Sequence, residues 1–304
     1  MPVAPEHSRG AASARLLRRL EWQVLRRLDG QLQGSHRTHF YGTGIDFADL
    51  RTYTPEDDVR HIDWNVTARL DEPHVRQYTE DRELTAWLLL DRSPSMVFGA
   101  ADRSKDVVLT ELAVTLARLL AGNGNRVGAI LFDRHVDKVL PARSGRAHVL
   151  RLAHDLGRRQ GVPSPPGEPT DLAALLHAAA GTIRRRSLVF VISDFITGDG
   201  WERPLARLAR RHEVVAVRVL DPLERELPDV GMIVVEDAET GEQVMVDTSD
   251  PAFRRRFHAE VDARDDALHA ALDRLGVRLD DVATDDDLVT ALVAMVQRSK
   301  RPRR

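Results

Sequence analysis

From Leu84 onward, short apolar runs alternate with stretches of helical periodicity, and this alternation constrains the fold more than any other feature of the sequence. The runs predict buried strands at "LTAWLLL", "RVGAILF", "HVDKVLP", "SLVFVIS", "EVVAVRVL" and the short "GVRLDDV". Helices are expected at 105–125, 146–158, 171–185, 201–211, 251–274 and 285–298. Strands that alternate with helices predict an α/β fold, in which a mainly parallel sheet is covered by helices on both faces.

The chain before this pattern is organised differently. Apolar residues recur every three or four positions between Leu17 and Leu32, which predicts an amphipathic helix within residues 1–34. Residues 35–80 are polar and lack helical periodicity, so we expect turns and short strands packed on a main domain at 81–298. Two further short strands are expected at 231–235 and 243–247. The basic tail, 299–304, is expected to be disordered.

Composition excludes several classes of function. The 304 residues include no cysteine, so disulfides, thiolate metal sites and a cysteine nucleophile are impossible. The sequence shows neither a signal peptide at its start nor an apolar run of membrane-spanning length, and we therefore expect a cytoplasmic protein with no membrane span. Both ends are rich in arginine whereas the body between them is acidic, so nucleic-acid binding is not expected.

Oxygen-bearing side chains follow the ends of two predicted strands. The first strand ends in Asp91, with Ser93 and Ser95 at alternate positions after it, and "SLVFVIS" is followed by Asp194. Between them, Thr170 lies at or next to the start of a helix. Carboxyl ends of parallel strands meet at one edge, where ligands bind. An all-oxygen set suits a hard cation, and we predict a site for Mg²⁺ or Mn²⁺ formed by these five residues.

The same triplet has a simpler interpretation, in which Asp91 and Ser93 hydrogen-bond the local backbone of a turn. The ordered arrival of Thr170 and Asp194 at the same edge favours the metal site. Because hydroxyl ligands are neutral, an ion held by three hydroxyls and two carboxylates would seek a further anionic ligand from outside. Such a site would serve to bind an anionic ligand.

Two stretches carry a resemblance to known families. "DRSPS", Thr170 and "SDF" resemble the metal-ion-dependent adhesion site of von Willebrand factor A domains. "GTGIDFADLRTYTPEDDVRHIDWNVTAR" resembles the signature of the bacterial domain-of-unknown-function family numbered fifty-eight. The resemblance covers about residues 35–298 and implies a Rossmann-like sheet. It also implies that Ser93, Ser95 and Thr170 hold the metal directly or through water, and that Asp91 and Asp194 act mostly through water.

Other polar clusters have structural interpretations. His61 and Asp63 would share one face of a strand, but without a third ligand nearby a hydrogen-bonding role is expected. The acidic turn at 57–60 forms a local ion pair or a docking signature, and Trp64 is expected to anchor the core. The carboxylates of "TDDD" at 284–287 are expected at the start of a helix.

Two functional hypotheses follow. The first is a non-enzymatic, metal-dependent protein-interaction module. The resemblance implies that such a module acts with a MoxR-type AAA+ ATPase on a client protein, with a carboxylate of the partner completing the metal sphere. The alternative is a magnesium-dependent phosphatase or hydrolase that uses Asp91 as nucleophile. That alternative is disfavoured because the usual aspartyl-phosphate signature has a second aspartate where this chain has Ser93. No phosphate-binding loop and no activated serine is present in the sequence.

Overall fold

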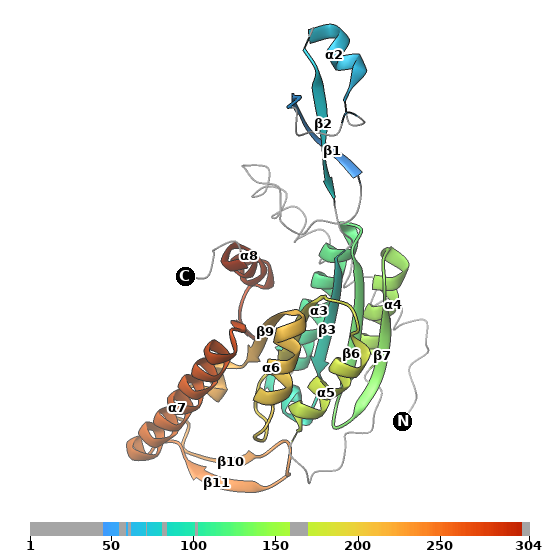
Figure 1. Cartoon of the computed structure of the whole chain (residues 1–304). Coiled ribbons are helices and arrows are strands. Elements are labelled where there is room, and N and C mark those ends of the chain that lie inside the picture. Colours follow the sequence, from blue (N-terminus) through green and yellow to red (C-terminus); the bar gives the residue numbers. More distant parts are fainter. Residues whose placement is uncertain are drawn as a thin grey trace.

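The computed structural model describes residues 45–54, 59, 62–70, 72–80, 84–100, 103–158 and 170–299. The helix expected within 1–34 and the tail residues 300–304 lie outside the described residues. The main sheet consists of β3 (Thr85–Asp91), β6 (Arg126–Phe132), β7 (Val136–Arg143), β8 (Leu188–Ser193), β9 (Glu213–Leu220) and β12 (Arg278–Ala283). The helices around it are α3 (Lys105–Gly122), α4 (Arg146–Gly157), α5 (Leu172–Thr182), α6 (Glu202–Arg211), α7 (Pro251–Leu275) and α8 (Leu288–Ser299) (Figure 1).

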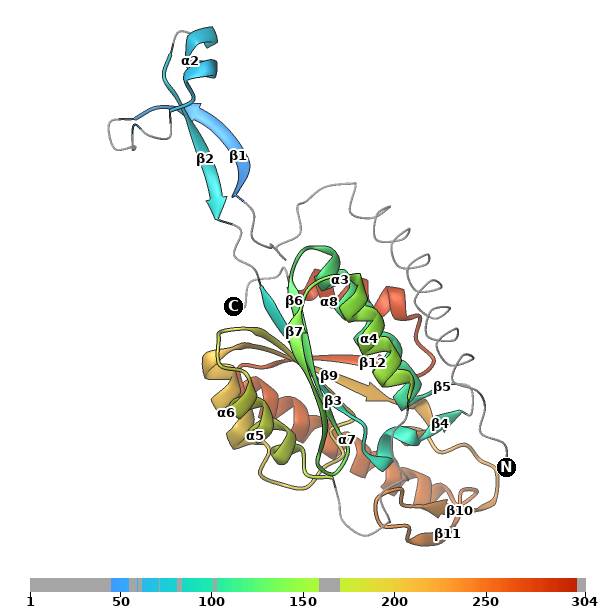
Figure 2. The same cartoon turned by 90° about the vertical axis from the view of Figure 1, so that its right-hand side faces the viewer.

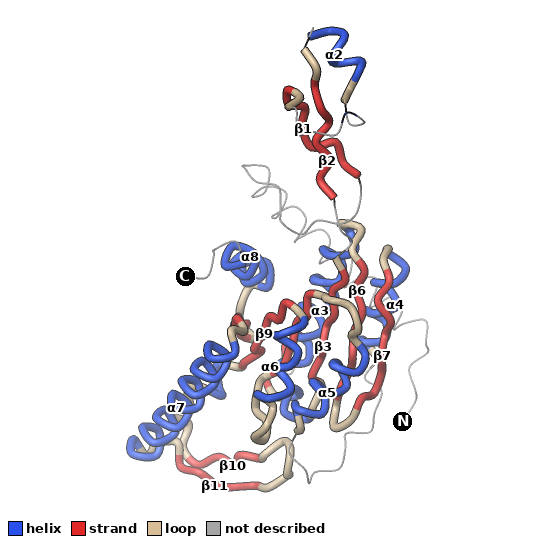
Figure 3. Tube along the Cα trace, viewed as in Figure 1, coloured by secondary structure: helices blue, strands red, loops and turns tan. Residues whose placement is uncertain are grey.

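The sheet has six strands in the order β12-β9-β8-β3-β6-β7, and every pairing except that of β6 with β7 is parallel. Its central strands are apolar and buried on both faces, as expected where helices cover both sides of a parallel sheet. The edge strand β7 alternates between more and less exposed residues. The predicted α/β fold and its alternation of strands and helices are confirmed (Figure 3).

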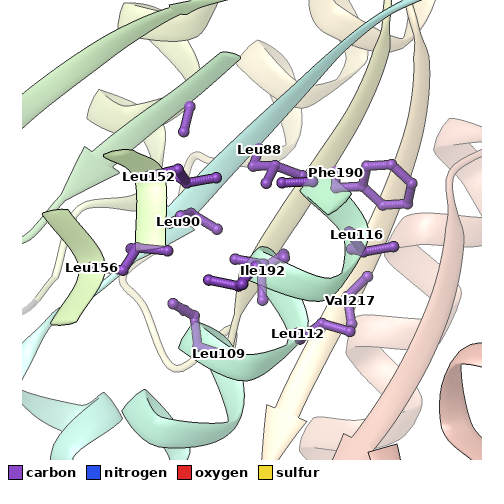
Figure 4. Close-up of a cluster of buried hydrophobic side chains, with 14 of the residues drawn as sticks. Leu88, Leu90, Leu109, Leu112, Leu116, Leu152, Leu156, Phe190, Ile192 and Val217 are labelled. Carbon is purple, nitrogen blue, oxygen red and sulfur yellow. The ribbon is translucent and has the colours of Figure 1, made fainter. Parts of the chain in front are cut away.

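Alternate residues of each strand supply two separate cores, because successive side chains point to opposite faces of a sheet. On one face, Leu88, Phe190 and Val217 pack against α3, α4 and α8 (Figure 4). On the other face, Trp87 and Val189 belong to a second core that includes residues of α5, α6 and α7. Figure 2 shows these two helical layers on opposite sides of the strands. The sheet is therefore held rigidly from both sides.

The segment before the sheet departs from the expectation of a helix-free region. It forms a β-hairpin of β1 (Ile45–Thr52) and β2 (His74–Glu80), which encloses a short helix, α2 (Trp64–Leu70). Asp63 caps this helix, since its Oδ1 accepts hydrogen bonds from the backbone N–H groups of Asn65 and Val66. This helix has only seven residues, so it is too short to produce a recognisable apolar periodicity in the sequence. The expectation that Trp64 anchors the core is wrong, because its side chain is 69% exposed.

Two smaller hairpins surround one end of the main sheet. β4 (Gly99–Ala100) and β5 (Arg103–Ser104) pair just before α3. β10 (Met232–Glu236) and β11 (Gln243–Asp247) pair between β9 and α7, where two short strands were expected. Both views place β10 and β11 outside the main sheet, at the end where β3 finishes (Figures 1 and 2).

The topology fixes where a ligand site can form. From β3 the chain passes through α3 to β6 on one side, and it later reaches β8 on the other side of β3. This reversal places the expected ligand position outside the carboxyl ends of β3 and β8, where ligands usually bind in open α/β sheets.

Packing across the strand pair β3 and β6 generates a first prediction. Gly128 lies opposite Trp87, and a Cβ atom added to Gly128 would lie 2.8 Å from two ring carbons of that tryptophan. We expect Gly128→Ala to lower the free energy of unfolding by about 1–3 kcal/mol through overpacking. Gly181→Ala is the matched control, because no atom lies within 4 Å of its new methyl group and the helix α5 gains up to about 1 kcal/mol. Urea unfolding that ranks the two variants alike would contradict this interpretation.

Candidate metal-binding site

The loop after β3 buries the first three predicted residues. A 3-10 turn, Pro94–Val97, follows the strand directly, and Pro94 restricts its first position. The backbone N–H of Ser93 donates to Asp91 Oδ1 at 3.0 Å, and the hydroxyls of Ser93 and Ser95 lie 3.1 Å apart. Asp91, Ser93 and Ser95 are all buried. The turn thus points the three side chains toward one another.

The loop after β8 is joined to the first loop through Ser193. The Ser193 hydroxyl donates to Asp91 Oδ2 at 2.6 Å and accepts from the backbone N–H of Phe195 at 2.9 Å. Phe195 has a φ of 57°, a left-handed conformation that a residue with a bulky side chain seldom adopts. Its ring packs edge-on against Trp201. This strained turn holds the intervening Asp194 in the crevice, where it is 5% exposed.

Thr170 comes from the loop before α5, and the post-β8 loop fixes its backbone. The Thr197 hydroxyl donates to the carbonyl oxygen of Thr170 at 2.6 Å and accepts from the N–H of Leu172. Asp171 caps the helix, so Thr170 lies next to the cap as expected. The structure therefore brings all five residues of the predicted site to the same edge of the sheet, and the local hydrogen bonds of the simpler interpretation are present within that cluster.

A lysine that sequence reasoning missed lies within the cluster. Lys105, the first residue of α3, is fully buried, and its ammonium donates to Asp194 Oδ2 at 2.8 Å and to Glu224 Oε1 at 2.5 Å. Burial opposes the charge on Lys105, but the attraction of Asp194 and Glu224 outweighs it and raises the pKa of the ammonium. The ammonium thus neutralises part of the negative charge at this edge. The rarity of lysine in the chain was the available signal, since it occurs only at 105, 138 and 300.

A glutamate from a distant hairpin also reaches the cluster. Glu239, in the turn between β10 and β11, accepts through Oε1 from the Thr170 hydroxyl at 2.8 Å and from the Ser95 N–H at 3.2 Å. Its side chain is buried, and its other oxygen, Oε2, has no hydrogen-bond partner among the described residues. No sequence signal distinguishes this residue, because acidic residues are common in exposed turns.

The electrostatic environment of this cluster disfavours the ionised form of Asp91. Burial, and secondly the neighbouring Asp194, raise the pKa of Asp91 to about 7, although hydrogen bonds from Ser193 and Ser93 oppose the rise. Within the described part of the chain, no three carboxylate or imidazole side chains converge as they do around a closed metal site. Hydroxyl groups must therefore supply the remaining ligands of any ion that binds here.

The other candidate residues have structural roles where they are described. Asp63 acts as a helix cap, in line with the hydrogen-bonding role expected for it, whereas His61 and most of the acidic turn 57–60 lie outside the described residues. In the "TDDD" stretch, Asp287 Oδ1 accepts from the N–H and the hydroxyl of Thr290 at the start of α8. The expectation of helix-start carboxylates is confirmed.

Comparison with known proteins identifies the family to which the chain belongs. The family model described as "Protein of unknown function DUF58" matches residues 49–267. The chain belongs to the DUF58 family, and the expected family membership is confirmed. The uncharacterized protein Rv1480 of Mycobacterium tuberculosis is 39% identical over 288 residues, which span 95% of this chain and 90% of that protein.

Solved structures with a similar arrangement include two bacterial proteins. An aerotolerance-related membrane protein from Bacteroides fragilis matches with a TM-score of 0.45 and 18% identity, over 70% of this chain and 97% of that chain. A von Willebrand factor type A protein from Catenulispora acidiphila matches with a TM-score of 0.38 and 11% identity, over 73% of this chain and 43% of that chain. Among the described helices, none has the length and apolar character needed to cross a membrane.

The buried ion pairs of Lys105 generate a second prediction. Lys105→Met leaves Asp194 and Glu224 without their buried cation, so we expect a loss of about 3–5 kcal/mol in the free energy of unfolding. Lys138→Met is the matched control, because the Lys138 side chain is 34% exposed and its ammonium forms one ion pair, so we expect a smaller loss than for Lys105→Met. Chemical denaturation of both variants makes the comparison. If Lys105→Met lost no more free energy of unfolding than Lys138→Met, the buried ammonium would not stabilise this edge as predicted.

The pKa of Asp91 generates a third prediction, for the metal-free protein. The folded pKa of about 7 lies well above the ordinary pKa of an aspartate, so between these two values the folded state retains a proton that the unfolded chain releases. The contribution of Asp91 to the free energy of unfolding is therefore lost as pH rises from the ordinary pKa of an aspartate to about 7. The negative charge that acts on Asp91 is Asp194, which is itself bonded to the Lys105 ammonium. In EDTA, Asp91→Asn should be more stable relative to wild type at pH 8 than at pH 5.5.

Asp137→Asn, which changes an exposed aspartate of β7, controls for the loss of one surface charge. Urea unfolding at the two pH values gives the comparison. The interpretation is wrong if wild type and Asp91→Asn differ in free energy of unfolding by the same amount at both pH values.

Proposed function

We propose that this protein is a non-enzymatic interaction module, which binds Mg²⁺ or Mn²⁺ at the edge formed by Asp91, Ser93, Ser95, Thr170 and Asp194. The observation that carries this proposal is the convergence of hydroxyls and carboxylates from separate loops in one buried cluster. Hydroxyls and carboxylates are the oxygen donors that these hard cations prefer. A bound divalent ion would supply positive charge and at least one coordination position for an anionic ligand.

The residues present fit such an ion. The carboxylate oxygen Oε2 of Glu239 is buried without a hydrogen-bond partner among the described residues, although burial of an unpaired carboxylate oxygen is costly. Burial, and secondly the charge of Asp194, raise the pKa of Asp91, and a cation bound nearby would favour the ionised form. Lys105 already engages one oxygen of Asp194. In this proposal Ser93, Ser95 and Thr170 would therefore contribute most of the direct ligands.

The proposed partner carries a carboxylate. Neutral hydroxyl ligands leave the ion under-neutralised, so an acidic side chain of a partner gains a charge-assisted contact in a partly desolvated crevice. The family resemblance supports a MoxR-type AAA+ ATPase, or the client on which it acts, as that partner. Recognition of this kind would depend on the metal.

The phosphatase or hydrolase alternative has less support. Asp91 would have to present an oxygen to substrate, but it is 1% exposed, and both of its oxygens accept hydrogen bonds, from Ser93 and from Ser193. The same contacts suit a residue that holds the loops in place.

Thermal unfolding with added metal tests the proposed site. Saturating Mg²⁺ or Mn²⁺ should stabilise the wild-type protein relative to EDTA, by about 2.7 kcal/mol at a hundredfold excess over Kd. The double variant Ser93→Ala/Ser95→Ala should lose most of this effect, because it lacks two of the neutral ligands. Ser249→Ala, which removes an exposed serine hydroxyl bonded to Asp247, should keep the effect. Absence of any metal-dependent shift in the wild-type protein would refute the proposal.

The partner can be tested with the same variants. Purified protein should capture a MoxR-type AAA+ ATPase in magnesium and release it in EDTA, whereas Ser93→Ala/Ser95→Ala should fail to capture it under either condition. Capture that is independent of both metal and variant would place the docking surface elsewhere.

A further inference from the structure

The hairpin β10–β11 is largely exposed, and its two ends determine its position. None of its strand residues is buried. Its exposed apolar side chains are Met232, Val234, Val235, Val244 and Met245. A two-stranded hairpin has little stability of its own. Contacts at its base and at its tip therefore hold it against the main domain.

At the base, the Thr248 hydroxyl accepts from the N–H of Val230 at 3.0 Å and donates to the carbonyl of Gly231 at 2.8 Å. Arg254, in α7, binds the carbonyl oxygen of Thr248 and forms an ion pair with Asp229 at 3.1 Å. These contacts attach the hairpin to the start of α7. The strands extend from this fixed base toward the site.

At the tip, the turn is built to present Glu239. Asp237 Oδ1 accepts from the backbone N–H groups of Glu239 and Thr240, and the Arg134 guanidinium donates to the carbonyl oxygen of Glu239 at 3.2 Å. The carboxylate then reaches the Thr170 hydroxyl and the Ser95 N–H, as described above. Only 7% of Glu239 is exposed. This glutamate is the residue through which the hairpin tip enters the crevice.

We propose that Glu239 is an internal ligand of the metal site, occupying the coordination position that an acidic partner would otherwise take. The inference rests on the proposed function, because it requires the metal. One carboxylate oxygen binds two groups of the site, and the other is buried with no hydrogen-bond partner among the described residues. An ion beside Oε2 satisfies that oxygen, as a bound metal does for an otherwise unpaired carboxylate.

The consequence is competition between two carboxylates for one position. While Glu239 is bound, the hairpin closes the crevice and an acidic partner cannot enter. Binding of the partner releases Glu239 and frees the tip of the hairpin. The site therefore has a closed state, described here, and an open state in which the hairpin is held only at its base.

Bound Mn²⁺ gives a direct readout of this position through the relaxation of water protons. In the wild-type protein Glu239 excludes water from one coordination position. Glu239→Ala should bind Mn²⁺ roughly tenfold more weakly, since a charge-assisted contact is lost, and should show a higher relaxation rate per bound ion. Adding acetate should lower that rate in Glu239→Ala, because the acetate carboxylate enters the free position, and should have little effect on wild type at the same concentration.

Two further variants secure the result. Glu239→Gln keeps an oxygen that can accept hydrogen bonds from Thr170 and Ser95, but it lacks the negative charge and should therefore also weaken Mn²⁺ binding. It replaces Glu239→Ala as the test of the internal ligand if the alanine variant does not fold. Glu242→Gln changes an exposed glutamate of the same turn and should behave as wild type.

The outcomes separate the two proposals. If wild type, Glu239→Ala and Glu239→Gln bind Mn²⁺ with equal affinity and equal relaxation rates, the metal site stands and the internal ligand is refuted. If the wild-type protein binds no Mn²⁺, the proposed function fails, and the internal ligand fails with it.

Discussion

Negative charge buried at the carboxyl edge of the sheet is the constraint on which the rest of this structure depends. Asp91, Asp194 and Glu239 reach this edge from three distant parts of the chain, and each is less than a tenth exposed, although the three carboxylates are not grouped closely enough to hold a metal ion by themselves. Carboxylates cannot be buried together without compensation, because desolvation and mutual repulsion disfavour their charged forms. The first residue of α3 and the loops at this edge supply that compensation through the Lys105 ammonium and the hydroxyl of Ser193, which donates to Asp91.

The compensation differs between the side of the site formed by β3, β8 and α3 and the side formed by the β10–β11 hairpin. Asp91 and Asp194 follow strands buried on both faces, and Ser193 and Lys105 bond them to neighbouring elements. Glu239 belongs to a hairpin whose strands bury no residue, and one of its carboxylate oxygens has no hydrogen-bond partner among the described residues. The side formed by buried strands therefore has the features of a preformed site, whereas few buried contacts hold the hairpin side.

The sequence predicted the parts of the site that belong to regular elements. Asp91 and Asp194 end apolar runs, and parallel topology alone places the ends of such runs together, so their convergence followed from periodicity. Thr170 followed from the helix start beside it. Lys105 was hidden because it opens an amphipathic helix, and its partner Glu224 lies 119 positions further along the chain. Glu239 was hidden for the same reason, since its contact with Ser95 spans 144 positions and its hairpin has no buried face that could fix its placement.

The departures elsewhere have the same physical origin. Trp64 was assigned to the core because tryptophan is usually well buried, but it opens a short helix in the hairpin arm and none of the residues of that helix is buried. Local rules therefore succeeded where a strand or a helix packs on the main sheet. They failed for α2, which buries none of its residues, because there only tertiary contacts decide which side chains are covered.

An internal carboxylate changes what a partner must provide. A ligand tethered by a short segment competes at an effective concentration on the order of millimolar, so a single carboxylate on another protein cannot displace it at ordinary cellular concentrations. A successful partner must add contacts beyond the metal, and these contacts must favour the open state. Exposed apolar side chains belong to β10 and β11, the two strands that lead into and out of the turn that carries Glu239. The surface around the site would then determine which partner binds, whereas competition with Glu239 for the metal would determine how tightly that partner must bind.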